Sequence, residues 1–149
     1  MTYSVDNGFQ QADDKNNKPR VGGLSCDELS GWKKIALNAV DTAGGVFSFE
    51  NDTANDYILD ICYIDVTTAS TGACTVDVGI ASDATTSDDT LFDGLDVNSA
   101  TGTFNNIDAA GTNGGIGIKL AAGEFLNASV ATGASAGIVG NAYIRFVRV

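Results

Sequence analysis

The sequence predicts an all-β protein, a two-sheet β-sandwich of jelly-roll type with an extended N-terminal arm. From Trp32 onward, short segments of alternating apolar and polar residues follow one another, separated by turns rich in Gly, Ser, Asn and Asp. The 149 residues include 18 Gly but one Pro, a composition that suits tight turns between short strands. No stretch shows sustained helical periodicity with caps. About eight strands with long connections in one domain favour a two-sheet sandwich.

Residues 1–30 differ in composition from the rest and are expected to form the arm, while residues 31–149 form the sandwich domain. The arm holds three of the eight basic residues, the one proline and polar runs such as QQADDKNNK, with isolated apolar anchors at Tyr3, Val5 and Phe9. Two interpretations stay open: a frayed terminus, or a tail that becomes ordered on a neighbouring subunit. The N-terminus lacks the apolar run of a secretory signal, so we expect synthesis in a cytosol.

The strongest strand signal is DYILDICYIDVTT at residues 56–68. Strict alternation places Leu59 and Ile61 on one face and Cys62 and Ile64 on the other. Both faces are largely apolar, so we expect this strand to be central in its sheet and covered on both sides.

The neighbouring strands are predicted from shorter patterns. Residues 32–40 and 46–50 have the length and composition of strands. CTVDVGIA at 74–81 alternates cleanly between apolar and polar residues. The intervening ASTG predicts that 56–68 and 74–81 form a hairpin that turns at Ser70–Thr71.

The second half of the chain is expected to contain short strands linked by long, Gly-rich excursions. Residues 116–133 predict two strands around a turn at 121–123, and residues 137–149 predict the terminal strand. Between 82 and 115, apolar residues recur at intervals and are expected to pin the chain to the core: Leu91, Phe92, Leu95, Val97, Phe104 and Ile107.

The three cysteines, Cys26, Cys62 and Cys74, form an odd number without a metal-binding spacing. In the predicted hairpin Cys62 lies opposite Gly79 and Cys74 opposite Thr67, so a disulfide between the two cysteines is out of reach. We therefore expect small, buried thiols in a reduced compartment.

The charge pattern excludes several classes of function. Between Lys34 and Lys119 lie 84 residues with 13 Asp or Glu and no Lys or Arg, and the net charge is −11. Such a surface repels phosphate backbones, so no nucleic-acid partner is expected. The absence of histidine removes Ser-His-Asp and Cys-His relays and the commonest zinc sites. No window approaches the apolar length of a membrane span, so no membrane partner is expected.

We accordingly predict that the protein is not an enzyme and holds no cofactor. GGIGIKL at 114–120 misses both the P-loop and the dinucleotide fingerprint. A hydrolase would need two carboxylates that face each other in a cleft, and no pair stands out in the sequence.

The acidic segment 83–96 offers a weak calcium candidate. Its hydroxyl-rich surroundings could supply further oxygen ligands, but an EF-hand loop would need a ligand where Leu91 stands. A solvated acidic loop is the simpler interpretation. The carboxylates of the candidate site are Asp83, Asp88, Asp89, Asp93 and Asp96.

The basic residues lie toward the two ends of the sequence, and the basic-free span between them is expected to face solvent. If the first and last strands of the sandwich are neighbours, the basic residues gather on one side of an acidic body. They are then either ordinary surface residues or part of a surface that docks on an acidic partner. The candidate docking residues are Tyr3, Phe9, Lys15, Lys18, Arg20, Arg145 and Arg148.

Residues 57–149 resemble small proteins that tailed bacteriophages encode near their major capsid protein. The resemblance rests on ILDICYIDVTTASTGACTVDVGIASDATTSDDTLFDGLDV, TFNNIDAAGTNGG and AAGEFLNASVATGASAGIVGNAYIRFVRV. It implies a head decoration, or cement, protein that clusters as an oligomer, with a trimer as the working expectation. The implied partner is the major capsid protein, at the virion surface, after synthesis in the host cytoplasm. The alternative is a carbohydrate- or receptor-binding sandwich of a virion fibre that uses the acidic loop with calcium.

Overall fold

The chain divides into two units, Met1–Trp32 and Lys33–Val149. In the first unit, β1 (Arg20–Val21) pairs antiparallel with β2 (Leu24–Ser25). Cys26 and most of the expected arm lie outside the described residues, so the role of the arm stays a prediction. The structure, a computed structural model, describes residues 20–21, 24–25, 31–99 and 101–149.

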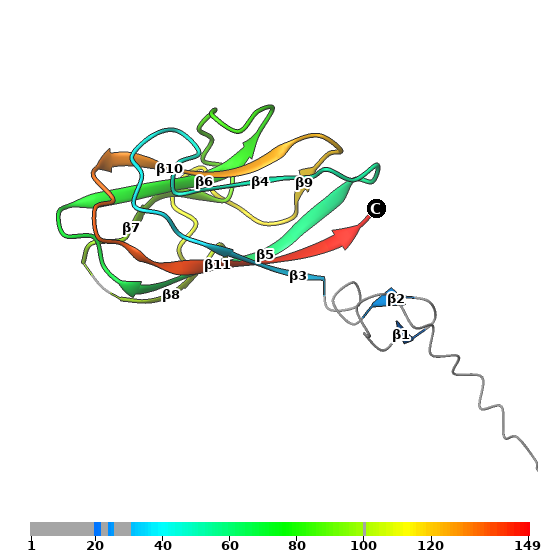
Figure 1. Ribbon diagram of the computed structural model, residues 1–149, viewed down its shortest axis with the longest axis horizontal. Helices are drawn as coiled ribbons and strands as arrows, with labels where there is room; N and C mark the ends of the chain where they lie inside the picture. The colour runs from blue at the N-terminus through cyan, green and yellow to red at the C-terminus, as the bar shows by residue number, and fades with distance from the viewer. Residues whose placement is uncertain (1–19, 22–23, 26–30, 100) are drawn as a thin grey trace, which may run out of the picture. The chain divides into compact units, whose positions relative to one another are not determined.

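The second unit is a sandwich of two antiparallel sheets, which confirms the predicted fold class (Figure 1). The described residues contain no helix, and so none that could cross a membrane. The four-stranded sheet has the order β4-β10-β6-β7, with β4 (Phe47–Glu50), β10 (Phe125–Gly133), β6 (Cys74–Ala81) and β7 (Phe92–Asp96). The five-stranded sheet has the order β3-β11-β5-β8, with β9 also paired to β5; its strands are β3 (Trp32–Ala36), β11 (Val139–Arg148), β5 (Tyr57–Thr68), β8 (Gly102–Asn105) and β9 (Ile118–Leu120).

The strand pairs are nested, which is the arrangement of a jelly roll. β3 pairs with β11, β4 with β10, β5 with β8 and β9, and β6 with β7. The chain therefore behaves as one long hairpin that is rolled up, and most successive strands lie in different sheets. One consequence is that the chain enters β3 and leaves β11 at the same end of the sandwich (Figure 1).

The predicted hairpin between β5 and β6 is wrong, because the two strands lie in opposite sheets. The segment that joins β5 to β6 does not form a hairpin turn. It makes hydrogen bonds to two other connecting segments. The Ser70 amide donates to the Val97 carbonyl, and the Thr71 amide donates to the Ala136 carbonyl. Each strand has an inner row of apolar side chains, and placing the strands in facing sheets buries these two rows against each other.

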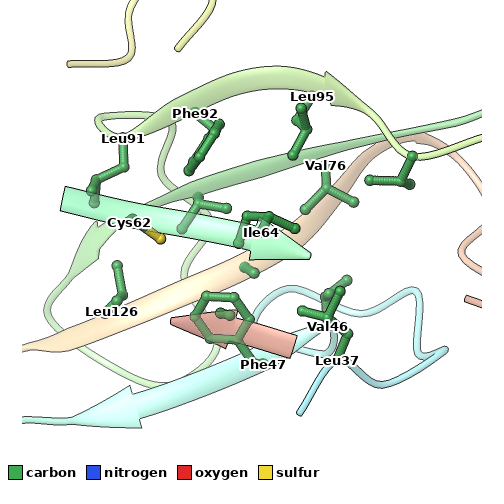
Figure 2. Close-up of a cluster of buried hydrophobic side chains, with 14 of the residues drawn as sticks. Leu37, Val46, Phe47, Cys62, Ile64, Val76, Leu91, Phe92, Leu95 and Leu126 are labelled. Atoms are coloured by element: carbon green, nitrogen blue, oxygen red, sulfur yellow. The ribbon is translucent and has the colours of Figure 1, made fainter. Parts of the chain in front are cut away.

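The side chains of both sheets meet in one core between the layers (Figure 2). Phe47 and Phe92 are among the largest fully buried residues, and burying a side chain of this kind stabilises the fold by about 1.5–3 kcal/mol. The prediction of buried thiols is confirmed for Cys62 and Cys74, which are both free. Burial raises the pKa of the Cys62 thiol to about 12, so it stays protonated and unreactive.

A β-bulge in β5 changes which residues face the core. The register between β5 and β11 shifts so that Arg145 lies opposite Ile61 while Phe146 lies opposite Leu59, which leaves Asp60 as the extra residue. Leu59 is consequently buried on the inner face, although strict alternation placed it on the same face as Ile61. The prediction for Leu59 was wrong because strict alternation of side chains assumes a regular strand. A bulge adds one residue and reverses the faces of the residues beyond it.

The outer face of β5 is only half-buried, whereas its inner face is fully buried. The strand is nevertheless central in its sheet, between β11 on one side and β8 and β9 on the other, as predicted. The expectation of full cover on both faces is therefore met on the inner face alone.

Four of the six predicted core anchors between 82 and 115 are buried, and Phe104 packs against the core. Ile107 is instead 61% exposed, so its predicted anchoring role was wrong. The chain turns directly after β8, where the side chain of Asn105 accepts the amides of Ile107 and Asp108. This turn directs Ile107 away from the core.

Asn106 fills the gap between two short strands on the same edge of β5. β8 and β9 pair with separate parts of β5, and Cys62 lies between those parts. The Cys62 amide donates to Asn106 Oδ1 over 2.8 Å, and the Asn106 amide donates to the Cys62 carbonyl over 3.2 Å. Asn106 Nδ2 also donates to the Gly115 carbonyl over 2.8 Å, which ties down the excursion between β8 and β9. One buried side chain therefore completes the edge of the sheet.

Replacing Asn106 with Ala should lower the free energy of unfolding by about 1–3 kcal/mol, because the buried Cys62 amide would lose its acceptor. Urea denaturation monitored by fluorescence measures this change. Asn38→Ala is the matched control, since Asn38 is exposed and its side chain makes a long 3.4 Å bond to the Val46 carbonyl, which the Asn38 backbone amide also reaches over 2.8 Å. The control should stay within about 0.5 kcal/mol of the wild type. Equal effects of both substitutions would contradict the bridging role of Asn106.

Candidate docking surface

The outer face of the five-stranded sheet carries aromatic and aliphatic side chains. Tyr143 on β11 lies directly opposite Tyr63 on β5, and Arg145 lies opposite Ile61. The neighbours of Tyr143 along β11 are fully buried, so alternation directs the tyrosine outward. The Lys34 ammonium of β3 lies 5.6 Å from the centre of the Tyr143 ring. We call these five residues, Lys34, Ile61, Tyr63, Tyr143 and Arg145, the aromatic face.

The outer face of the four-stranded sheet has a different character. Apart from the half-buried Phe125, its outward rows hold mainly small and polar side chains, and loops of the same chain cover part of it. Asn127 accepts the Ser48 hydroxyl, and its Nδ2 donates to the carbonyls of Asp83 and Thr86 in the connection after β6. The Gly44 amide donates to the Ser129 hydroxyl over 2.7 Å, and both Asn127 and Ser129 are buried. Tyrosine and arginine are enriched in protein contact surfaces, so the aromatic face is the better candidate for docking.

The structure places two of the seven predicted docking residues on β11 with described side chains. Arg145 forms an ion pair with Asp60, and Arg148 donates to Asn55 Oδ1 over 2.7 Å. Exposed pairs of this kind add little stability, so they orient the guanidinium groups more than they strengthen the fold. Arg20 lies in β1. The remaining residues, Tyr3, Phe9, Lys15 and Lys18, lie outside the described part of the chain, and their docking role stays a prediction.

The described basic side chains gather on one sheet. β3 and β11 are neighbours, which was the condition of the sequence-based prediction. The strands of the four-stranded sheet contain no Lys or Arg. The basic-free span nevertheless supplies strands to both sheets, so the expectation that it forms one outward surface was wrong. The basic residues of the five-stranded sheet are Lys33, Lys34, Lys119, Arg145 and Arg148.

An acidic edge lies at β6, β7 and the connection between them. We define it as Asp77, Asp88, Asp89 and Asp93. Burial and the neighbouring carboxylates raise the pKa of Asp77 above its usual value, although the Gly94 amide donates to Asp77 Oδ1 over 2.8 Å and opposes this shift. The folded protein therefore destabilises the charged form of the Asp77 carboxyl relative to its neutral form.

Two carboxylates of the calcium candidate, Asp83 and Asp96, accept hydrogen bonds in separate local turns. Asp83 accepts from Thr85 and Thr86, and these bonds lower its pKa. Asp96 accepts from Asn98 and Ser99, with the same effect on its pKa. In the part of the chain that the structure describes, no group of three or more His, Cys, Asp or Glu side chains is placed to hold a metal ion.

Asp89 and Asp93 meet through a different residue, Asn113. Asn113 Nδ2 donates to Asp89 over 2.9 Å, and its backbone amide donates to Asp93 over 3.1 Å. The excursion between β8 and β9 is thereby fixed to the acidic edge. The sequence offered no signal for this contact, because the three residues meet only in the folded chain.

Substituting Asp77 with Asn should raise the melting temperature near neutral pH and leave it unchanged near about pH 3. A carboxyl with a raised pKa in the folded state contributes stability below its unfolded pKa and loses it as the pH rises through the folded pKa. The Asn oxygen can still accept the Gly94 amide. Thermal denaturation across this pH range measures the difference.

Asp83→Asn is the control of opposite sign, since the pKa of Asp83 is lowered. Its contribution is present above the unfolded pKa and is lost as the pH falls through the folded pKa, so this variant should melt lower than the wild type near neutral pH. The same sign for both variants would contradict the electrostatic account.

Calcium should leave the melting temperature unchanged, because Asp83 and Asp96 are engaged in separate local turns and Asp89 and Asp93 accept hydrogen bonds from Asn113. Melting curves with calcium and with chelator test this expectation, and magnesium controls for ionic strength. A calcium-specific rise of several degrees would instead favour the fibre alternative.

Comparisons with known proteins identify a structural neighbour. No family model and no curated protein matches the chain. The solved structure of the capsid of Ralstonia phage GP4 contains a chain with a similar fold, at a TM-score of 0.54 and 19% sequence identity. The alignment covers 79% of this chain and 83% of that chain. The β-sandwich of this protein is thus a fold that is also found in a phage capsid.

Proposed function

We propose that the protein is a structural virion component that decorates and stabilises the capsid surface of a tailed bacteriophage by binding across capsomer junctions. The observation that carries this proposal is the similarity of fold to a chain of the Ralstonia phage GP4 capsid, which spans most of both chains. The resemblance of residues 57–149 to small proteins of tailed phages supports the same role from the sequence.

The physical properties of the sandwich suit a protein that is displayed in a dense array. A net charge of −11 keeps copies soluble and opposes uncontrolled aggregation. The sheet that carries the described basic side chains would face an acidic partner, for which the major capsid protein is the natural candidate. The role needs neither a catalytic residue nor a cofactor.

The proposed mechanism is mechanical reinforcement. A protein that contacts two capsomers at once adds its binding free energy to the junction, which must otherwise withstand the packaged DNA alone. A specific contact of this kind buries at least about 1,000 Å² in total. Most of its binding energy would come from a few buried aromatic and basic side chains.

Particles that lack this chain should release DNA at lower temperature and under weaker shear than complete particles, and the purified protein should restore their resistance. Dye accessibility of the DNA during heating measures release, and imaging of whole particles locates the bound protein. An unrelated protein of similar net charge serves as the control for the addition. Equal resistance of particles with and without the chain would disprove the cementing role.

A further inference from the structure

An asparagine that is followed by glycine lies in the excursion between β8 and β9. Asn113 is exposed in a turn at residues 111–113, and Gly114 comes next. A second Asn-Gly pair, Asn7-Gly8, lies outside the described residues. We propose that Asn113 is a site of spontaneous deamidation and that the product releases this excursion from the acidic edge. The modification would occur whether or not the protein serves in a capsid.

The reaction is a cyclisation that is followed by hydrolysis. The backbone nitrogen of Gly114 loses its proton to hydroxide and attacks Asn113 Cγ, and the side-chain nitrogen of Asn113 leaves as ammonia. The product of this step is a succinimide ring. Water then adds to either ring carbonyl and opens the ring to aspartate or to isoaspartate. The net change consumes water, releases ammonia and converts the amide to a carboxylate, so no oxidant or reductant takes part.

The packing of residue 114 requires the glycine that makes this attack easy. A Cβ atom on residue 114 would lie 2.1 Å from the Ala110 carbonyl oxygen and 2.6 Å from the Leu91 carbonyl oxygen. Both oxygens belong to the backbone, so neither can move aside as a flexible side chain would. Glycine fits because it has no Cβ atom, and for the same reason no side chain shields its nitrogen from Asn113.

The side chain of Asn113 is open to water. Its Nδ2 donates to Asp89 over 2.9 Å in a solvent-exposed hydrogen bond. Such a bond exchanges with water at a small net cost in free energy, so the side-chain amide is able to rotate toward the Gly114 nitrogen. The bond from the Asn113 backbone amide to Asp93 holds the turn without involving any of the reacting atoms.

The product places a negative charge beside other negative charges. The new carboxylate would stand where the amide donated to Asp89, and an ionised carboxylate has no hydrogen to donate. Burial and the neighbouring carboxylates already raise the pKa of Asp77 in the acidic edge, so a further charge there is repelled. Isoaspartate also lengthens the main chain between residues 113 and 114, which displaces Gly114 from its close contacts. Both products therefore weaken the contact between the excursion and the acidic edge.

The site is tested by ageing the full, folded chain at mildly alkaline pH. Peptide mass spectrometry measures the gain in mass at each asparagine and separates aspartate from isoaspartate. Conversion at Asn113 should be at least about tenfold faster than at Asn38, which corresponds to a barrier lower by about 1.4 kcal/mol. Asn38 is the internal control, since it is also exposed but precedes Ala39. Asn113→Gln should stop conversion at this position, because its longer side chain would have to close a larger ring.

The consequence of the modification is tested with two further variants. Asn113→Asp carries the carboxylate of the product, and Asn113→Ala loses the hydrogen-bond donor without adding charge. The Asp variant should melt a few degrees below the Ala variant. Concentrated salt should remove most of this difference, because it screens the repulsion between exposed carboxylates.

Each outcome decides one part of the proposal. Rapid conversion at Asn113, with isoaspartate among the products, supports the modification site. Conversion no faster than at Asn38, or conversion that continues in Asn113→Gln, would overturn it. An Asp variant as stable as the Ala variant, or a difference that salt does not change, would overturn the release of the excursion. Neither measurement contains capsids, so failure here leaves the decoration role standing.

Discussion

The burial of one apolar row from each sheet against the other is the constraint on which the rest of the structure depends. Neither sheet can hide its inner row alone, so most strands that follow each other in sequence are placed in facing layers. Val78 on β6 and Leu59 on β5 are both fully buried in the core that results. The jelly-roll order follows, because a long hairpin that is rolled up buries both rows along its whole length.

The side chains of buried asparagines form hydrogen bonds with backbone groups at the places where the jelly-roll order interrupts regular strand pairing. Asn106 accepts the Cys62 amide in the gap between β8 and β9, and Asn127 donates to a carbonyl of the connection after β6. Asn51 donates to the carbonyls of Asn55, Leu120 and Ala121 and so joins two connections at one end of the sandwich. A side-chain amide can donate and accept at once, which suits places where one strand ends before the next begins.

The distribution of charge is a product of topology. β3 and β11 come from opposite ends of the sequence, and their pairing collects most of the described cations on one sheet. β6 and β7 follow each other, and their pairing keeps the carboxylates of one acidic segment together. A chain of low basic content thus acquires two chemically distinct surfaces, and the capsid proposal draws on this separation.

The sequence by itself determined the all-β class, the position of the strong strand at 56–68, the burial of Cys62 and the acidic character, because these depend on local composition and alternation. Tertiary structure alone decided the strand partners, the bulge at Asp60, the exposure of Ile107 and the contact of Asn113 with the acidic edge. These features depend on the free energy of contacts between residues far apart in the chain. A pattern of period two states that one face is apolar, but it does not state which distant strand will cover that face.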